Sequence, residues 1–118
     1  MRMDRIIEIN EQSTLYVGRA TELLDRVLPK GRTIIITDAN IDRLYPNLVR
    51  RFEHIIVGQG EACKSLQTVD RVYRELMELG ADRSTFILGI GGGIVTDIAG
   101  FVAATYMRGV DFGFVSTT

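Results

Sequence analysis

The stretch TFILGIGGGIVTD, residues 85–97, decides the fold of this 118-residue chain. Its apolar first part, 85–88, is typical of a buried strand, and the apolar stretch over 94–107 predicts a helix. Glycines dominate the turn between them, at 89–93, where they allow positive φ angles and the close approach of a ligand. The first N–H groups of a helix lack internal partners and carry a partial positive charge. We therefore predict that this turn holds the phosphates of a nucleotide.

A second interpretation of the turn is purely structural. Glycines also permit tight packing of a strand against the helix that follows it. A single glycine would favour that interpretation, whereas four within residues 89–93 favour the phosphate site.

Strand and helix patterns alternate along the chain. Continuous β-branched runs such as 33–37 suit parallel strands that are buried on both faces. Strands are predicted at 5–9, 14–17, 33–37, 54–57, 85–88 and 112–115, and helices at 19–28, 41–52, 65–79 and 94–107. The first two strands are close enough in sequence to pair, and Pro46 should kink the second helix. The pattern predicts an α/β fold, a Rossmann-like parallel sheet with flanking helices, in one small domain over residues 1–118.

The ends of the predicted strands collect the polar and glycine-rich segments. Such segments lie at 38–40, 58–64, 89–93 and 116–118. Ligands of parallel sheets bind beyond the carboxyl ends of the strands, so these segments should share one edge. Asp38, directly after a strand, can also cap the following helix.

Composition excludes several classes of protein. The net charge of -1, from 14 basic and 15 acidic residues, argues against a nucleic-acid surface. A single cysteine, Cys63, favours a reducing compartment, and with His54 it is too few for a self-contained zinc site. No stretch is apolar enough for a signal peptide or a membrane span, so we expect a cytoplasmic protein.

The turn departs from the usual dinucleotide fingerprint. Ile94 stands where G-x-G-x-x-G requires its last glycine, and the turn follows a late strand. Asp111 has the spacing of a ribose-binding acid but lies at the start of a strand. Glu61 is a better-placed carboxylate for ribose hydroxyls, and Lys64 could reach a phosphate or ribose oxygen. The alternative is a capping Glu61 and a solvated Lys64.

Two charged residues belong to the helix that follows the turn. Asp97, in its first turns, either complements the helix dipole or hydrogen-bonds a ribose or a nicotinamide amide. Arg108, at its far end, either complements the dipole there or binds a phosphate of a neighbouring site or subunit.

Three motifs resemble those of the 3-dehydroquinate synthase family. GGGIVTDIAGFVAATYMRG, residues 91–109, is similar to its core motif. Residues 112–118 are similar to its strand that ends in a threonine pair, and Gly60-Glu61-x-x-Lys64 resembles its G-E-x-x-K loop. Thr96 and Ser116 depart from the pattern, where many members have glycine and proline.

The resemblance implies a set of cofactor-binding residues. Together with the glycine turn, the NAD contacts expected are Asp38, Glu61, Lys64, Gly91, Gly92, Gly93, Ile94, Val95, Asp97, Thr117 and Thr118. Arg108 matches an arginine that helps to bind the substrate phosphate. No residue of this chain matches a catalytic or metal-binding position of the family.

The resemblance also implies an activity. The family converts 3-deoxy-D-arabino-heptulosonate 7-phosphate to 3-dehydroquinate and phosphate with catalytic NAD, in aromatic amino acid biosynthesis. Its members carry a C-terminal zinc and substrate domain that this chain lacks, and they form homodimers. We expect this chain to be the NAD-binding half, inactive alone. Alternatives are a related sugar-phosphate cyclase, a polyol dehydrogenase or a non-catalytic nucleotide-binding module.

Overall fold

The computed structural model describes residues 3–10, 13–18, 20–58 and 64–117. The chain divides into two compact units, Met1–Lys30 and Gly31–Thr118. In the first unit, β1 (Met3–Asn10) and β2 (Ser13–Gly18) form an antiparallel hairpin, followed by α1 (Ala20–Val27). The predicted pairing of the first two strands is therefore confirmed.

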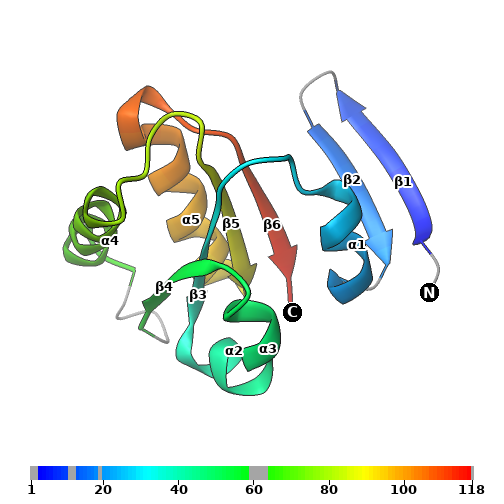
Figure 1. Ribbon diagram of the computed structural model, residues 1–118, viewed down its shortest axis with the longest axis horizontal. Coiled ribbons are helices and arrows are strands. Elements are labelled where there is room, and N and C mark those ends of the chain that lie inside the picture. Colours follow the sequence, from blue (N-terminus) through cyan, green and yellow to red (C-terminus); the bar gives the residue numbers. More distant parts are fainter. Residues whose placement is uncertain (1–2, 11–12, 19, 59–63, 118) are drawn as a thin grey trace. The chain divides into compact units, whose positions relative to one another are not determined.

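The second unit is built on a four-stranded parallel sheet in the order β4-β3-β5-β6. Its elements are β3 (Thr33–Asp38), α2 (Ala39–Leu44), α3 (Pro46–Val49), β4 (Glu53–Val57), α4 (Leu66–Glu78), β5 (Phe86–Gly91), α5 (Gly93–Thr105), a 3-10 turn η2 (Tyr106–Arg108) and β6 (Phe112–Ser116). Figure 1 shows α4 and α5 beside each other against the sheet, and α2 and α3 near the carboxyl ends of the strands. The predicted α/β fold with a parallel sheet and flanking helices is confirmed.

The core of this unit lies between the sheet and the helices α4 and α5. Ile34, Ile35 and Ile36 of the central strand β3 are all fully buried, as expected for a parallel strand covered on both faces. Ile34 and Ile36 form one buried cluster with Val72 and Leu76 on α4 and with five residues of α5, which are Val95, Ile98, Ala99, Val102 and Ala103. No helix in the described residues is long and apolar enough to cross a membrane.

Two predicted helices end earlier than expected. The helix predicted at 41–52 is two short helices, α2 and α3, separated at Tyr45. Pro46 has no N–H to donate and its ring would clash with a preceding carbonyl, so it starts a new helix as its first residue. The helix predicted to continue to Met107 ends at Thr105, because Tyr106 has an extended ψ of 124°; Met107 and Arg108 then take left-handed φ angles of 48° and 70°.

Gly89 was predicted in the turn, but the structure places it inside β5, where the packing interpretation is the correct one. A Cβ on Gly89 would lie 2.7 Å from the Cβ of Ala99 and 3.4 Å from the ring of Phe114. Gly89 therefore lets α5 pack close against the sheet. The strand ends at Gly91 and the helix begins at Gly93, so the turn centres on Gly92 between them.

The substitution Gly89→Ala should lower the free energy of unfolding by about 1–3 kcal/mol, because the added methyl group overpacks the β5–α5 contact. Urea unfolding followed by circular dichroism measures this. Gly93→Ala is the matched control, since a Cβ there meets nothing within 4 Å and the backbone is helical. It should stabilise the protein by about 0.4–1 kcal/mol. Equal stability of the two variants would contradict the packing role.

A second prediction concerns the amino end of the sheet. Arg32 donates two hydrogen bonds to Glu53, of 2.5 and 2.6 Å, and it also bonds the carbonyl oxygens of Leu79 and Gly80. The hydrogen bond from Arg32 holds the pKa of Glu53 below its usual value. The stability from this pair is therefore present above about pH 4.3 and is lost as the pH falls through the lower pKa of the folded state.

Glu53→Gln should accordingly lower the free energy of unfolding near neutral pH by no more than about 1 kcal/mol, because both side chains are partly exposed. The difference from the parent protein should shrink towards zero in acid. Denaturant titrations between pH 3 and pH 7 test this, with Glu78→Gln on α4 as an exposed control. Hydrogen bonds from Ser84 also lower the pKa of Asp82. Asp82 is present in both the parent protein and the Glu53→Gln variant, so its contribution cancels in the difference between them. A pH-independent difference would contradict the prediction.

Candidate functional site

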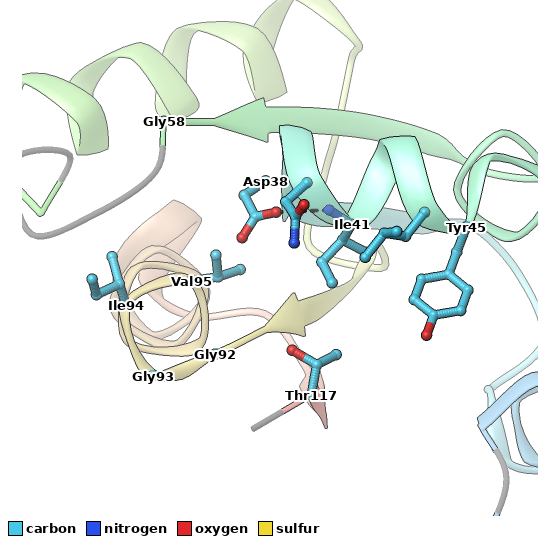
Figure 2. Close-up of a pocket in the computed structure, with 11 residues that line it drawn as sticks. Asp38, Ile41, Tyr45, Gly58, Gly92, Gly93, Ile94, Val95 and Thr117 are labelled. Carbon is cyan, nitrogen blue, oxygen red and sulfur yellow. Dashed lines mark hydrogen bonds between the residues drawn. The ribbon is translucent and has the colours of Figure 1, made fainter.

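A cavity of about 480 Å³ lies at the carboxyl end of the sheet. Its walls come from the ends of β3, β4, β5 and β6 and from the helices that follow β3 and β5; they comprise Asp38, Asn40, Ile41, Leu44, Tyr45, Gly58, Gly92, Gly93, Ile94, Val95 and Thr117. Figure 2 shows these residues around the cavity. The parallel topology thus brings the strand ends together as predicted.

The amino end of α5 faces this cavity without a side-chain cap. Gly92 occupies the N-cap position and makes no side-chain hydrogen bond, whereas Asp38 caps α2 and Ser65 caps α4. The first intrahelical bond of α5 runs from the N–H of Thr96 to the carbonyl of Gly92, at 3.0 Å. The N–H groups of the first helical turn therefore have no partner within the helix, so they can bind an anion in the cavity.

Each glycine of the turn has its own structural reason. Gly91 has a φ of 154°, and a Cβ there would lie 2.9 Å from the Cβ of Val95. Its carbonyl accepts a 3.1 Å hydrogen bond from the N–H of Thr117, which holds the end of β6 beside the turn. A Cβ on Gly93 would meet nothing within 4 Å, so this position has open space beside it. Gly91 thus shapes the turn, and Gly93 keeps the helix end accessible.

Thr96, one of the two departures from the family pattern, fastens the turn. Its hydroxyl donates towards the carbonyl oxygens of Gly92 and Gly93, both at 3.2 Å. The hydroxyl thus bonds back to the helix's own first turn. The structure accommodates threonine here while the amino end of α5 stays on the cavity wall.

Asp38 has the capping role that the sequence predicted. One of its carboxylate oxygens accepts a 2.8 Å hydrogen bond from the N–H of Ile41. The same side chain lines the cavity, together with Asn40. A carboxylate and an amide side by side can accept and donate hydrogen bonds to the hydroxyls of a sugar.

Lys64 and Asp97, two further predicted cofactor contacts, form an ion pair with a nitrogen–oxygen distance of 2.9 Å. Both side chains are about half exposed, and neither belongs to the cavity wall. The pair joins the start of α4 to the second turn of α5. The structure therefore brings these residues together beside the amino end of α5, in contact with each other.

Three predicted positions remain: Arg108, Glu61 and Thr118. Arg108 follows the carboxyl end of α5, whose 13 residues place it about 20 Å from the cavity end of that helix. The structure thus does not bring Arg108 to this cavity. Glu61 and Thr118 lie outside the described residues. Arg108, Glu61 and Thr118 stay predictions.

Sequence reasoning missed part of the cavity wall. Asn40 belonged to a segment recognised as a strand-end loop, but only Asp38 was selected from it. Ile41, Leu44 and Tyr45 were assigned to the helix predicted at 41–52, with no part in a site. The signal that could have identified them is Pro46, which ends the helix directly after two large apolar residues.

The chain is similar to known proteins both in sequence and in fold. The model of the family described as 3-dehydroquinate synthase N-terminal matches residues 54–118. The 3-dehydroquinate synthase of Natranaerobius thermophilus is 36% identical over 95% of this chain and 34% of its own length. That of Thermococcus kodakarensis is 42% identical over 74% of this chain and 27% of its own length. The chain thus spans about a third of the length of these relatives.

Solved structures share the fold. A structure of 2-deoxy-scyllo-inosose synthase, 24% identical, superposes with a TM-score of 0.78 over 97% of this chain and 36% of its own. A structure of 2-epi-5-epi-valiolone synthase from Streptomyces hygroscopicus, with NAD+ and Zn2+ bound, is 28% identical. It superposes with a TM-score of 0.64 over 74% of this chain and 27% of its own. With the match of the family model to more than half of its residues, these similarities show that the chain belongs to the 3-dehydroquinate synthase family.

Proposed function

We propose that the amino end of α5 binds the diphosphate of NAD. The observation that carries the proposal is the uncapped helix terminus on the cavity wall, behind a glycine turn with open space at Gly93. Unpaired N–H groups and the helix dipole together favour a doubly charged phosphate group without any lysine or arginine. The donor set of this chain therefore fits the cofactor.

The other cavity residues complete the proposed site. Asp38 and Asn40 are placed to bond ribose hydroxyls, and Thr117 lies on the opposite side of the turn, with its N–H bonded to Gly91. We propose Glu61, Lys64, Asp97 and Thr118 as further contacts, because they match cofactor-binding positions of the family pattern. Lys64 and Asp97 bond each other, so binding the cofactor would replace part of this ion pair with hydrogen bonds to the cofactor.

For the whole protein we propose 3-dehydroquinate synthase activity, with this chain as its NAD-binding half. The support is the name shared by the relatives at 36% and 42% identity. Bound NAD would supply reversible oxidation of a substrate alcohol, and this chain would hold and orient it. The proposed substrate is a sugar phosphate, and Arg108 is proposed to bind its phosphate group. The proposed reaction belongs to aromatic amino acid biosynthesis in the cytoplasm. We further propose a homodimer.

A related sugar-phosphate cyclase is the second candidate, because the structures that share the fold are cyclases of that class. Product analysis distinguishes the two activities. We also propose a divalent metal for the whole protein. Within the described residues, no three His, Cys, Asp or Glu side chains are grouped to hold one. No step is therefore assigned to a metal on this chain.

The substitution Gly93→Val should weaken NAD binding at least about tenfold, a loss of ~1.4 kcal/mol, because the side chain occupies the open space beside the helix terminus. Isothermal titration calorimetry with NAD measures the affinity, and thermal unfolding verifies the fold of each variant.

Asp111→Asn is the matched control for this experiment. Asp111 has the spacing of a ribose-binding acid, but its carbonyl bonds the N–H of Ile87 at the amino end of β5, across the sheet from the cavity. Its substitution should leave NAD affinity unchanged. Unaltered binding by a folded Gly93→Val variant, or an equal loss in both variants, would overturn the proposed site.

A further inference from the structure

The turn between α5 and β6 contains two left-handed residues that are not glycine. Met107 and Arg108 have φ angles of 48° and 70°, a region that is unfavourable for side chains because the Cβ atom approaches a backbone carbonyl. Glycine avoids that cost, and the next residue, Gly109, is a glycine with a φ of 105°. Left-handed residues other than glycine persist where the surrounding structure enforces them, and they are concentrated at functional sites. Met107 and Arg108 thus keep their side chains at a conformational cost.

Tyr106, directly before these two residues, is anchored through its side chain. It is 7% exposed and belongs to the core cluster. Its hydroxyl donates a 2.9 Å hydrogen bond to the carbonyl of Ala81, the residue after the left-handed Gly80 at the end of α4. The N–H of Ala81 donates a 2.9 Å bond to the carbonyl of Leu76, so α4 holds the acceptor of the tyrosine in place. The hydroxyl of Tyr106 therefore ties the end of α5 to the end of α4.

Backbone hydrogen bonds close the turn behind Tyr106. The N–H of Gly109 donates a 2.7 Å bond to the carbonyl of Tyr106. The N–H of Val110 donates a bond of the same length to the carbonyl of Ala103, within α5. Because only two residues lie between Tyr106 and Gly109, the position of Tyr106 determines where the backbone of Arg108 lies.

The side chain of Arg108 is exposed, and among the residues that the structure describes no carboxylate forms an ion pair with it. A guanidinium binds a phosphate through two parallel hydrogen bonds, so its orientation matters as well as its charge. Ordering a long side chain costs conformational entropy when a ligand binds. A backbone that is already fixed reduces the number of conformations that Arg108 must lose.

We propose that Tyr106 is a positioning residue: its hydroxyl, bonded to Ala81, holds the left-handed turn that presents Arg108 to the phosphate of the substrate. This inference rests on the proposed function, in which Arg108 binds that phosphate. The 13 residues of α5 separate Tyr106 from the NAD cavity by about 20 Å. Loss of the hydroxyl should therefore weaken the binding of the sugar phosphate and leave the binding of NAD unchanged.

The substitution Tyr106→Phe removes only the hydroxyl. In the whole protein it should raise the KM for 3-deoxy-D-arabino-heptulosonate 7-phosphate about threefold to tenfold, the range for loss of one hydrogen bond, with kcat within about twofold of the parent protein. Steady-state kinetics measures both constants. Calorimetry without NAD, where the sugar phosphate is not consumed, measures its affinity directly, and a separate titration should show unchanged NAD affinity.

Tyr73→Phe is the matched control, because it also removes one hydroxyl from the contact between α4 and α5. The ring of Tyr73 stacks on that of Tyr106, with 6.3 Å between the centroids, and phenylalanine keeps this stacking. The hydroxyl of Tyr73 bonds that of Thr105, within α5 and before the turn. The KM of this variant should equal that of the parent protein.

Met107→Gly is a second variant of the turn, and it leaves the core intact because Met107 is 47% exposed. Glycine gives the backbone beside Arg108 more conformations. The KM should therefore rise about twofold to fivefold, again without a matching fall in kcat. Thermal unfolding verifies the fold of each variant, and Met107→Gly decides the outcome if Tyr106→Phe does not fold.

The decisive comparison combines Tyr106→Phe with Arg108→Gln. Arg108→Gln alone should raise the KM at least about tenfold, and adding Tyr106→Phe should then raise it by less than about 1.5-fold, because a positioning residue acts only through the group that it positions. An unchanged KM in Arg108→Gln would overturn the proposed role of Arg108 and this inference with it. If Arg108→Gln does raise the KM, three results would overturn the role of Tyr106 alone: no rise in the folded turn variants, an equal rise in Tyr73→Phe, or a full effect of Tyr106→Phe in the Arg108→Gln background.

Discussion

The close contact between β5 and α5 is the constraint on which the site depends. It exists because Gly89 leaves no side chain between the strand and Ala99, which brings the helix onto the sheet. The chain must then reverse direction within Gly91 and Gly92, and only glycine tolerates the φ of 154° at Gly91 beside Val95. The amino end of α5 consequently lies directly at the end of β5. The same packing that stabilises the fold thus places unpaired N–H groups where a parallel sheet receives its ligands.

The two ends of the sheet serve different physical tasks. At the amino end, Arg32 bonds Glu53 and the carbonyl oxygens that end α4, so polar groups there are satisfied by one another. At the carboxyl end, the N-cap of α5 has no side-chain bond and the cavity wall has exposed apolar surface. Polar groups without internal partners reduce stability unless water or a ligand satisfies them. The hydrogen bonds of Arg32 at the amino end stabilise the sheet. The carboxyl end can therefore keep polar groups without internal partners, which a ligand can bind.

Much of this architecture could be predicted from the sequence, because alternation of β-branched runs with amphipathic runs specifies a parallel sheet. The kink predicted at Pro46 is a complete break between α2 and α3 at Tyr45, but hydrophobic periodicity did not identify the residues before it as an apolar cavity wall. Gly89 was assigned to the turn because composition alone cannot distinguish a glycine needed for packing from one needed for a ligand. Asp38, Gly92, Gly93, Ile94, Val95 and Thr117 do line one cavity, since strand ends of a parallel sheet converge. The place of Arg108 could not be predicted, because it depends on left-handed backbone at Met107 and Arg108 after the helix.

A chain with a net charge of -1 can hold a dianionic ligand only through local features. Among the residues that the structure describes, no lysine or arginine lines the cavity, and Lys64 is already paired with Asp97 beside α5. Attraction must then come from the helix terminus, whose dipoles are fixed by the fold and need no reorganisation when the ligand arrives. Such dipoles act over a short range and have no affinity for the base or the sugar. Retention of a whole nucleotide therefore requires further contacts at a distance from α5, and the cavity offers them on α2 and on the residues that flank it, Asp38 and Tyr45.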